Sequence, residues 1–175
     1  MLERPSGAVT DPFFWLRDRN DPRTLSYLEA ENAHCDGWFS AHRELIDDIF
    51  DEIKSRIQET DESVPVFKDG WWYITRTVEG LSYGIHCRGH SKETAVDNVL
   101  LDENVLAQGL DYFALGAFDI SPDSRLLAWS FDIDGSEHYT MRIRDLDTGV
   151  DLDDVIVETS AAGTAWSADS STLFY

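Results

Sequence analysis

One phrase of this sequence returns at a regular interval, and that repeat constrains the fold more than any other feature. The segment ISPDSRLLAW at 120–129 reappears as WSADSSTLFY at 166–175, and a weaker copy, FKDGWWYIT, stands at 67–75. The polar turn residues of the two stronger copies recur 46 residues apart: Ser121, Asp123 and Ser124, then Ser167, Asp169 and Ser170. An Asp followed by a small residue favours a tight turn, and the apolar run behind it predicts a strand.

Short runs of Val, Ile, Tyr, Phe and Trp follow one another from Ser63 onward, separated by turn pairs such as DG, EG and TG. We predict a strand for each run and a helical turn at 103–108. The expected strands cover 64–67, 71–78, 83–88, 98–102, 113–120, 125–132, 139–146, 155–158, 164–167 and 172–175. Repeats of about 40 to 50 residues with four short strands each are typical of β-propeller blades.

The repeat therefore predicts a mostly β chain with a first blade at 61–109, a second at 110–160 and the start of a third at 161–175. The last run stops at Tyr175 inside an apolar strand, whereas a closed propeller needs about four blades or more. We expect an open strand edge there, and we interpret the sequence as the amino-terminal part of a longer protein.

Residues 1–60 follow a different pattern, an arm and then two amphipathic helices between 21 and 59. An Asp at position 21 can cap free amide groups, and the Pro after it fits the first helical position. Apolar residues recur at helical spacing on both sides of a break expected at 41–44. Neither helix can bury its apolar stripe alone, so the stripes require a further partner. Three aromatic residues are expected to fasten the arm to the body: Phe13, Phe14 and Trp15.

The charge balance limits the partners of the chain. It carries 34 acidic and 14 basic residues, a formal net charge of −20, which argues against nucleic acid as a partner. Two interpretations of the acidity remain open. It can reflect a salt-adapted or GC-rich source and act mainly on solubility, or it can concentrate cationic peptides at the surface.

No run of eighteen apolar residues occurs, and the first sixteen residues lack the apolar core of a signal peptide. The expectation is a cytoplasmic protein without a membrane segment. Cys35 and Cys87 are the only cysteines, so we expect two reduced, packed thiols rather than a disulfide framework.

Four long phrases carry a resemblance to a known family: DPFFWLRD at 11–18, YLEAEN at 27–32, DESVPVFKDGWWYITR at 61–76 and DYFALGAFDISPDSRLLAWSFDIDGSEHYTMRIRDLDTG at 111–149. From about Asp11 to Tyr175 the chain resembles the amino-terminal region of the prolyl oligopeptidase family, and within it the oligopeptidase B (protease II) subfamily. The resemblance implies a cytoplasmic serine peptidase whose α/β-hydrolase domain is capped by a seven-bladed propeller that admits only short peptides.

The resemblance also implies that the amino-terminal helices pack on the hydrolase domain and that cleavage follows Arg or Lys. The catalytic Ser, Asp and His of the family lie in the hydrolase domain, so no catalytic, cofactor-binding or metal-binding residue is assigned in this chain. The expected partners are short peptides and that hydrolase domain. The alternative is a propeller without a hydrolase domain that serves as a protein or peptide interaction module.

The segment GLSYG at 80–84 matches the GxSxG pattern of serine hydrolases, which makes Ser82 a candidate nucleophile. Such a nucleophile requires a strand, a sharp turn and then a helix. Here strand-like segments lie on both sides, so we predict a hairpin turn at 79–81 instead. A triad of Ser82, Asp134 and His138, with His86 close by in sequence, can be written in hydrolase order but lacks the supporting α/β framework.

The remaining candidates have simpler interpretations. The acidic runs at 132–137 and 145–154 depart from the spacing of a calcium loop, so we predict hairpin turns with solvated carboxylates. The adjacent pairs His34–Cys35 and His86–Cys87 diverge on a helix or strand and lack zinc-site spacing. Four tryptophans on predicted strands are expected in blade cores: Trp71, Trp72, Trp129 and Trp166.

Overall fold

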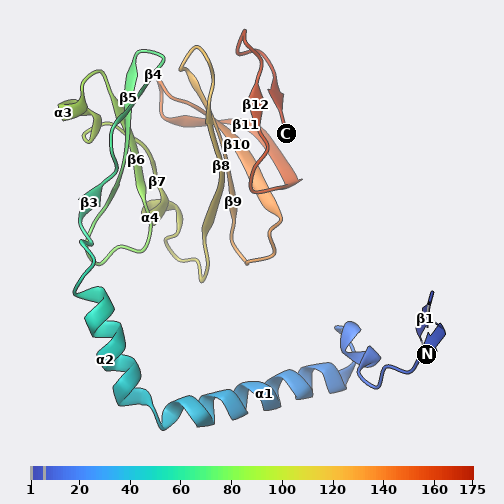
Figure 1. The fold of residues 1–175 in the computed structure, drawn as a ribbon. Helices are drawn as coiled ribbons and strands as arrows, with labels where there is room; N and C mark the ends of the chain where they lie inside the picture. The colour runs from blue at the N-terminus through green and yellow to red at the C-terminus, as the bar shows by residue number, and fades with distance from the viewer. Residues whose placement is uncertain (1, 6) are drawn as a thin grey trace. The chain divides into compact units, whose positions relative to one another are not determined.

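A computed structural model describes residues 2–5 and 7–175, and the chain divides into two units, Met1–Ile57 and Gln58–Tyr175. In the first unit, helix α1 (Pro22–Ser40) is followed by helix α2 (Arg43–Lys54) (Figure 1). The carboxylate of Asp21 caps α1 by accepting a hydrogen bond from the Arg23 N–H at 3.0 Å, as predicted. The second helix ends at Lys54, a turn earlier than the expected 59.

The arm before α1 contains elements that the sequence pattern did not predict. A hairpin joins β1 (Leu2–Arg4) to β2 (Gly7–Val9), and a 3₁₀ helix, η1, spans Phe14–Arg17. The aromatic run does not pack as a whole: Phe13 and Phe14 are 59% and 45% exposed. Only Trp15 fastens the arm, because its ring meets that of Tyr27 edge-on and its carbonyl accepts a hydrogen bond from the Thr24 hydroxyl.

The second unit is built mainly from antiparallel β-sheets. The first sheet has the order β3-β5-β6-β7, with β4 also paired to β5: β3 (Asp61–Glu62), β4 (Val66–Lys68), β5 (Trp71–Thr77), β6 (Ile85–Gly89) and β7 (Val99–Asp102). Its pairings are antiparallel. Helix α3 (Lys92–Ala95) covers β6, and helix α4 (Glu103–Leu106) leads to the next sheet.

The second sheet repeats this arrangement in the order β11-β10-β9-β8: β8 (Ala114–Ile120), β9 (Leu126–Asp132), β10 (Tyr139–Asp145) and β11 (Val150–Thr159). A further antiparallel pair joins β12 (Ala165–Trp166) to β13 (Leu173–Phe174). The predicted strands are present with small shifts at their ends. The largest difference is β11, which begins five residues before the predicted 155 because Asp151 pairs with Arg144 across the ladder.

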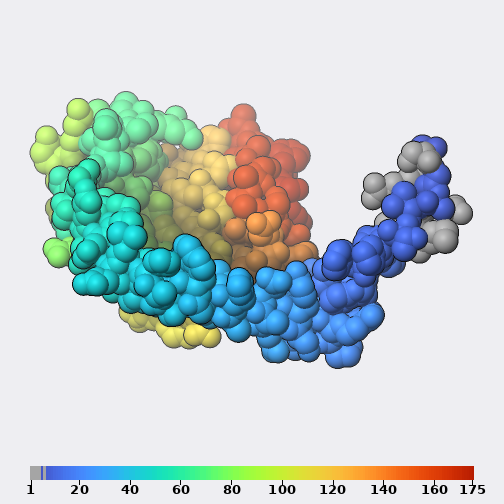
Figure 2. Space-filling view, turned by 60° about the horizontal axis from the view of Figure 1, so that its bottom comes forward, coloured from blue at the N-terminus to red at the C-terminus, as the bar shows by residue number. Residues whose placement is uncertain are grey.

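The sheets stand side by side in chain order, as both views of the second unit show (Figures 1 and 2). Leu101 of the first sheet packs with Leu127 and Trp129 of the second, and all three are nearly inaccessible to solvent. The next seam is bridged by Trp166, whose indole N–H donates to the Asp119 carbonyl at 3.1 Å. An antiparallel sheet of five strands followed by one of four, packed face to face, forms the β-propeller arrangement that the repeat predicted.

The repeated phrase forms the same hydrogen-bonded turn in both stronger copies. The Ser121 hydroxyl donates to Asp123 at 2.6 Å and accepts from the Leu126 N–H at 2.8 Å. Ser167 does the same with Asp169 at 2.6 Å and the Thr172 N–H at 2.9 Å. Ser124 and its equivalent at 170 both have left-handed backbones, with φ of 62° and 60°. The repeat thus encodes the connection between the first two strands of a blade.

Two packing predictions hold only in part. Trp129 is 3% exposed, but the other three tryptophans are half-buried: Trp71, Trp72 and Trp166. Cys87 lies in a buried cluster with Ile74 and Ile85, whereas Cys35 is exposed. The prediction of a packed Cys35 was wrong, since Thr24 is the buried residue of α1 and the rest of that helix is open.

The close approach of α3 to β6 depends on Gly89. A Cβ at this position would lie 2.7 Å from the Ala95 Cα and backbone N. We therefore expect Gly89→Ala to lower the free energy of unfolding by about 1–3 kcal/mol, as overpacking does. Gly37→Ala is the control, because nothing lies within 4 Å of its Cβ and Ala favours a helix by about 0.5–1 kcal/mol. Urea unfolding followed by tryptophan fluorescence measures both, and an unchanged midpoint in Gly89→Ala would contradict the close packing.

Candidate functional site

The GLSYG segment lies in the loop between β5 and β6, so the element that follows Ser82 is a strand rather than a helix. Gly80 has a φ of 80°, as a turn glycine can, and the Leu81 N–H donates to the Val78 carbonyl at 3.0 Å. Ser82 is exposed, and within residues 2–5 and 7–175 no hydrogen bond to its hydroxyl is found. The predicted hairpin turn is therefore present, and the loop lacks the strand–turn–helix geometry of a nucleophile elbow.

Helix α4 holds the end of this loop in place. The Asn104 side chain accepts from the Tyr83 N–H and donates to the Tyr83 carbonyl, both at 3.0 Å. Gly84 leaves room for a second contact, since a Cβ there would lie 3.2 Å from Glu103 Oε1. The two glycines of the motif thus serve the turn and its attachment to α4.

The space beside Gly84 is used by a hydroxyl–imidazole–carboxylate network. His86 Nε2 lies 2.7 Å from Glu103 Oε1, and His86 Nδ1 lies 3.2 Å from the Thr75 hydroxyl. The imidazole ring packs 4.8 Å from the ring of Phe118 in the next sheet. The same three kinds of group form a hydrolase triad, but Thr75 and His86 here are directly opposed in a strand pair. The network joins β5, β6 and α4 at the seam between the sheets.

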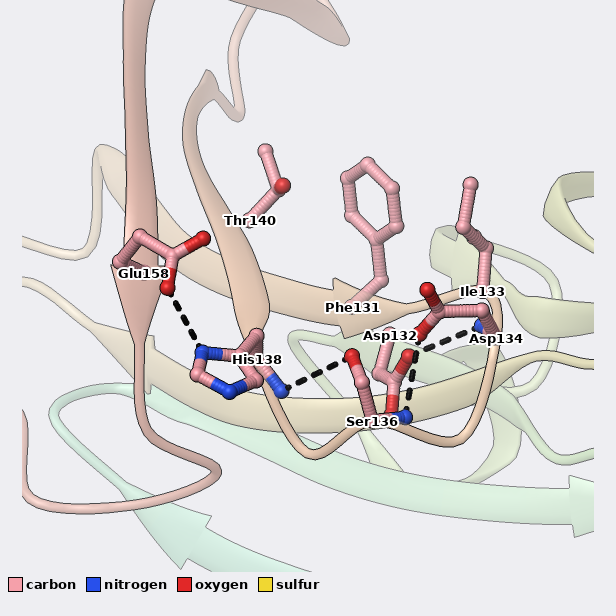
Figure 3. A pocket seen from close by; sticks show the side chains of 8 residues that line it. All are labelled: Phe131, Asp132, Ile133, Asp134, Ser136, His138, Thr140 and Glu158. Atoms are coloured by element: carbon pink, nitrogen blue, oxygen red, sulfur yellow. Dashed lines mark hydrogen bonds and ion pairs between the residues drawn. The ribbon is translucent and has the colours of Figure 1, made fainter. Parts of the chain in front are cut away.

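The hairpin between β9 and β10 borders a cleft of about 350 Å³ (Figure 3). Its lining combines acidic, hydroxyl and apolar side chains: Phe131, Asp132, Ile133, Asp134, Ser136, His138, Thr140 and Glu158. Asp134 and His138 of the postulated triad do share this cleft, but Ser82 is not among the lining residues. His138 Nδ1 instead pairs with Glu158 at 2.7 Å, and both side chains are largely exposed.

Asp132 organises the hairpin from its base. Its carboxylate is buried and accepts from the backbone N–H groups of Asp134, Gly135 and Glu137 at 2.9, 3.0 and 2.9 Å. The hydrogen bond from the Asp134 N–H is the main reason why the pKa of the Asp132 carboxyl lies below its usual value. The Asp132 carboxylate is thus fully engaged in hydrogen bonds within the turn, as expected for the predicted hairpin.

The second acidic run is organised in the same way. The Asp145 carboxylate accepts hydrogen bonds from the N–H groups of Asp147 and Thr148, both at 3.0 Å. The bond from Thr148 is the main reason why the pKa of the Asp145 carboxyl lies below its usual value. Gly149 follows with a φ of 72°. Within the described residues, no group of three His, Cys, Asp or Glu side chains could hold a metal ion. Burial raises the pKa of the Cys87 thiol, which disfavours the reactive thiolate.

None of the helices in the described ranges is long and apolar enough to cross a membrane. The polar groups of the loop, the network and the cleft chiefly stabilise turns and the seam between the sheets.

Comparison with known proteins identifies the family to which this chain belongs. The family model described as "Prolyl oligopeptidase, N-terminal beta-propeller domain" matches residues 2–175. The chain belongs to the prolyl oligopeptidase family and represents its amino-terminal propeller part.

Two curated relatives illustrate the similarity. The chain is 37% identical to "Dipeptidyl aminopeptidase BI" of Pseudoxanthomonas mexicana over 193 residues, covering 100% of this chain and 27% of the relative. It is 28% identical to "Protease 2" of Moraxella lacunata, covering 94% and 25%. The solved structure of oligopeptidase B from Leishmania major superposes with a TM-score of 0.82 at 28% identity, covering 94% of this chain and 24% of that one. The chain thus spans about a quarter of the length of the relatives it matches.

Sequence reasoning missed the residues that fasten the loop and the seam, above all Glu103, Asn104 and Arg88. The predicted helical turn at 103–108 placed the first two on the right element. Nothing in the spacing indicated that they face a loop about twenty residues earlier. Gly84 was the available clue, because a glycine near a strand often marks a place where another chain segment lies close to the backbone.

The pKa of Asp132 generates a pH-dependent prediction. A carboxyl with a lowered folded-state pKa contributes stability above its unfolded pKa of about 4, and that contribution is lost as pH falls through the folded value. We expect Asp132→Asn to lower the urea midpoint at pH 7, with a difference from wild type that shrinks toward pH 3. Asp153→Asn, at an exposed position on β11, is the control and should change little. A deficit in Asp132→Asn that is equal at both pH values would contradict the assignment.

Proposed function

We propose that this chain is the gating and scaffolding part of a serine-type oligopeptidase that cleaves short peptides after Arg or Lys. The observation that carries the proposal is the match of residues 2–175 to the propeller of the prolyl oligopeptidase family. In this proposal residues 1–60 form an arm and helical segment, 61–109 and 110–160 are the first two blades, and 161–175 begins the third. The protein acts in the cytoplasm, without nucleic acid or membrane partners.

The exposed apolar side chains of the helical segment indicate that it packs against a partner outside the propeller. The apolar side chains of α2 and the residues after it are about half exposed: Leu45, Ile49, Phe50, Ile53 and Ile57. Exposed apolar area of this kind favours burial against another surface. The proposed surface is a carboxy-terminal α/β-hydrolase domain of the same protein. Chemistry takes place there, through an acyl-enzyme formed by an activated serine, with a histidine as base and an oxyanion site.

We propose that the blades select substrates by size and take no part in catalysis. Ser82 lies on a loop without a helix behind it, and His86 is engaged with Glu103 and Thr75. No residue of this chain is therefore proposed as catalytic. In this proposal a small aperture bounded by the blades excludes folded proteins and long unfolded chains, and that exclusion limits the substrates to short peptides.

The test uses the protein expressed from its complete open reading frame with fluorogenic peptides that differ in the residue before the cleaved bond. We expect turnover of Arg and Lys peptides, no covalent cofactor requirement, and a kcat/KM within about twofold of wild type in Ser82→Ala. An inhibitor that acylates active-site serines should abolish turnover in both proteins.

Two outcomes would contradict the proposal. Turnover by well-folded 175-residue chain that Ser82→Ala abolishes would make this segment a hydrolase by itself. A complete protein that binds peptides but never cleaves them would favour the alternative, a propeller interaction module. Cleavage only after other residues would correct the specificity and leave the peptidase assignment in place.

A further inference from the structure

A groove of about 250 Å³ lies at the seam between the first two sheets, between β4 and β5 of the first sheet and β8 of the second. Its lining comes from three strands: Val66, Lys68, Tyr73, Phe118, Asp119 and Ile120. Elsewhere the seam is filled, because Leu101, Leu127 and Trp129 are nearly inaccessible to solvent. At the groove it is open, and Val66 remains 61% exposed.

Strand register makes the walls of this groove apolar. Val66 is opposite Tyr73 in the first sheet. Phe118 and Ile120 are paired with Trp129 and Leu127, so they share the face that forms the seam. Asp119 lies between them and is paired with Ala128, and the alternation of side chains along a strand places it on the opposite face. The groove therefore has room and suitable walls for an apolar side chain.

The lining holds one cation, Lys68, and one acidic residue, Asp119, whose side chain the strand alternation places on the other face. Lys68 belongs to the groove, and within residues 2–5 and 7–175 it has no ion pair. Lys68 is opposite Trp71, and the Arg88 guanidinium carbon lies 4.0 Å from the centre of that indole ring. In a chain with a net charge of −20, Lys68 and Arg88 thus lie on the two strands that flank β5.

Arg88 is not a lining residue, but it lies directly opposite the lining residue Tyr73 in the strand pair. The residue is 3% exposed, and its Nη1 donates to the Ser124 carbonyl at 2.6 Å. Its Nε is buried without a hydrogen-bond partner, and among the described residues no carboxylate forms an ion pair with it. A buried cation without a counter-charge is costly, so a carboxylate held close to it is favoured over a neutral group or a cation.

We infer that this groove binds the carboxyl-terminal residue of a short peptide. The apolar side chain packs against Val66, Tyr73 and Phe118, and the α-carboxylate pairs with Lys68. The class of ligand follows from the proposed peptidase function, since short peptides are what the propeller would enclose. The site itself rests on the groove, its register, the lining residue Lys68, which forms no ion pair among the described residues, and the nearby buried Arg88.

The test uses the protein from the complete open reading frame and two ligands, N-acetyl-leucine and N-acetyl-leucine amide. Each contains a single amino acid, so neither has a peptide bond between two residues that a peptidase could cleave. Ligand-observed NMR titration measures both dissociation constants. We expect the acid to bind more tightly than the amide. Lys68→Gln should weaken the acid about threefold to fivefold, the range of a partly exposed ion pair, and leave the amide unchanged.

Val66→Asp provides a second variant, because the exposed side chain can change without disturbing the core. It places a negative charge in the groove and should weaken the acid more than the amide. Lys92→Gln is the matched control, since the Lys92 ammonium lies over the Trp72 ring at 4.6 Å rather than at the groove. This variant should bind both ligands as wild type does.

Equal affinity for acid and amide, or an unchanged acid affinity in Lys68→Gln, would overturn the inference. So would the absence of saturable binding, or concentration-dependent sedimentation that Val66→Asp removes, which would mean that a second copy of the chain covers the groove. Hydrolysis of an Arg peptide by the same preparation reports on the proposed peptidase function separately, so the two ideas can fail independently.

Discussion

The sheets of this chain depend on one another because neither can bury its apolar face alone. Leu101 of the first sheet and Leu127 and Trp129 of the second form one cluster that excludes solvent. Burying such side chains stabilises a fold by about 1.5–3 kcal/mol each relative to exposure. Hydrogen bonds also cross the seam: the Arg88 side chain donates to the Ser124 carbonyl and the Arg144 side chain to the Leu100 carbonyl.

The repeated turn connects that constraint to the sequence. Ser121 and Asp123 close the turn between β8 and β9, and the left-handed Ser124 directs its carbonyl to Arg88 of the preceding sheet. In the other direction, the Ser170 hydroxyl accepts from the Asp123 N–H at 3.0 Å. The same short phrase therefore closes a hairpin and contacts both neighbouring blades. This explains why it recurs while the strands around it vary.

The fold could be predicted further than the site. Strands with turn pairs between them, the Asp21 cap and the helical break all depend on local sequence, and the structure has them within a few residues. The site depends on pairs distant in sequence, such as Asn104 with Tyr83 and His86 with Glu103, and no single-sequence pattern specifies such pairs. The exposure of Cys35 and Phe13 was missed for the same reason. Apolar composition indicates that a surface is to be buried, but not which surface covers it.

We propose that these blades limit a peptidase to short peptides, and a measurement of size selectivity tests this proposal. The measurement compares cleavage of one Arg-containing sequence, first as a peptide of about eight residues and then inside an unfolded protein of about a hundred residues, by the protein from the complete open reading frame. We expect efficient cleavage of the peptide and a rate at least roughly a hundredfold lower for the same bond in the long chain, about 2.7 kcal/mol of discrimination. Comparable rates on both substrates would contradict it.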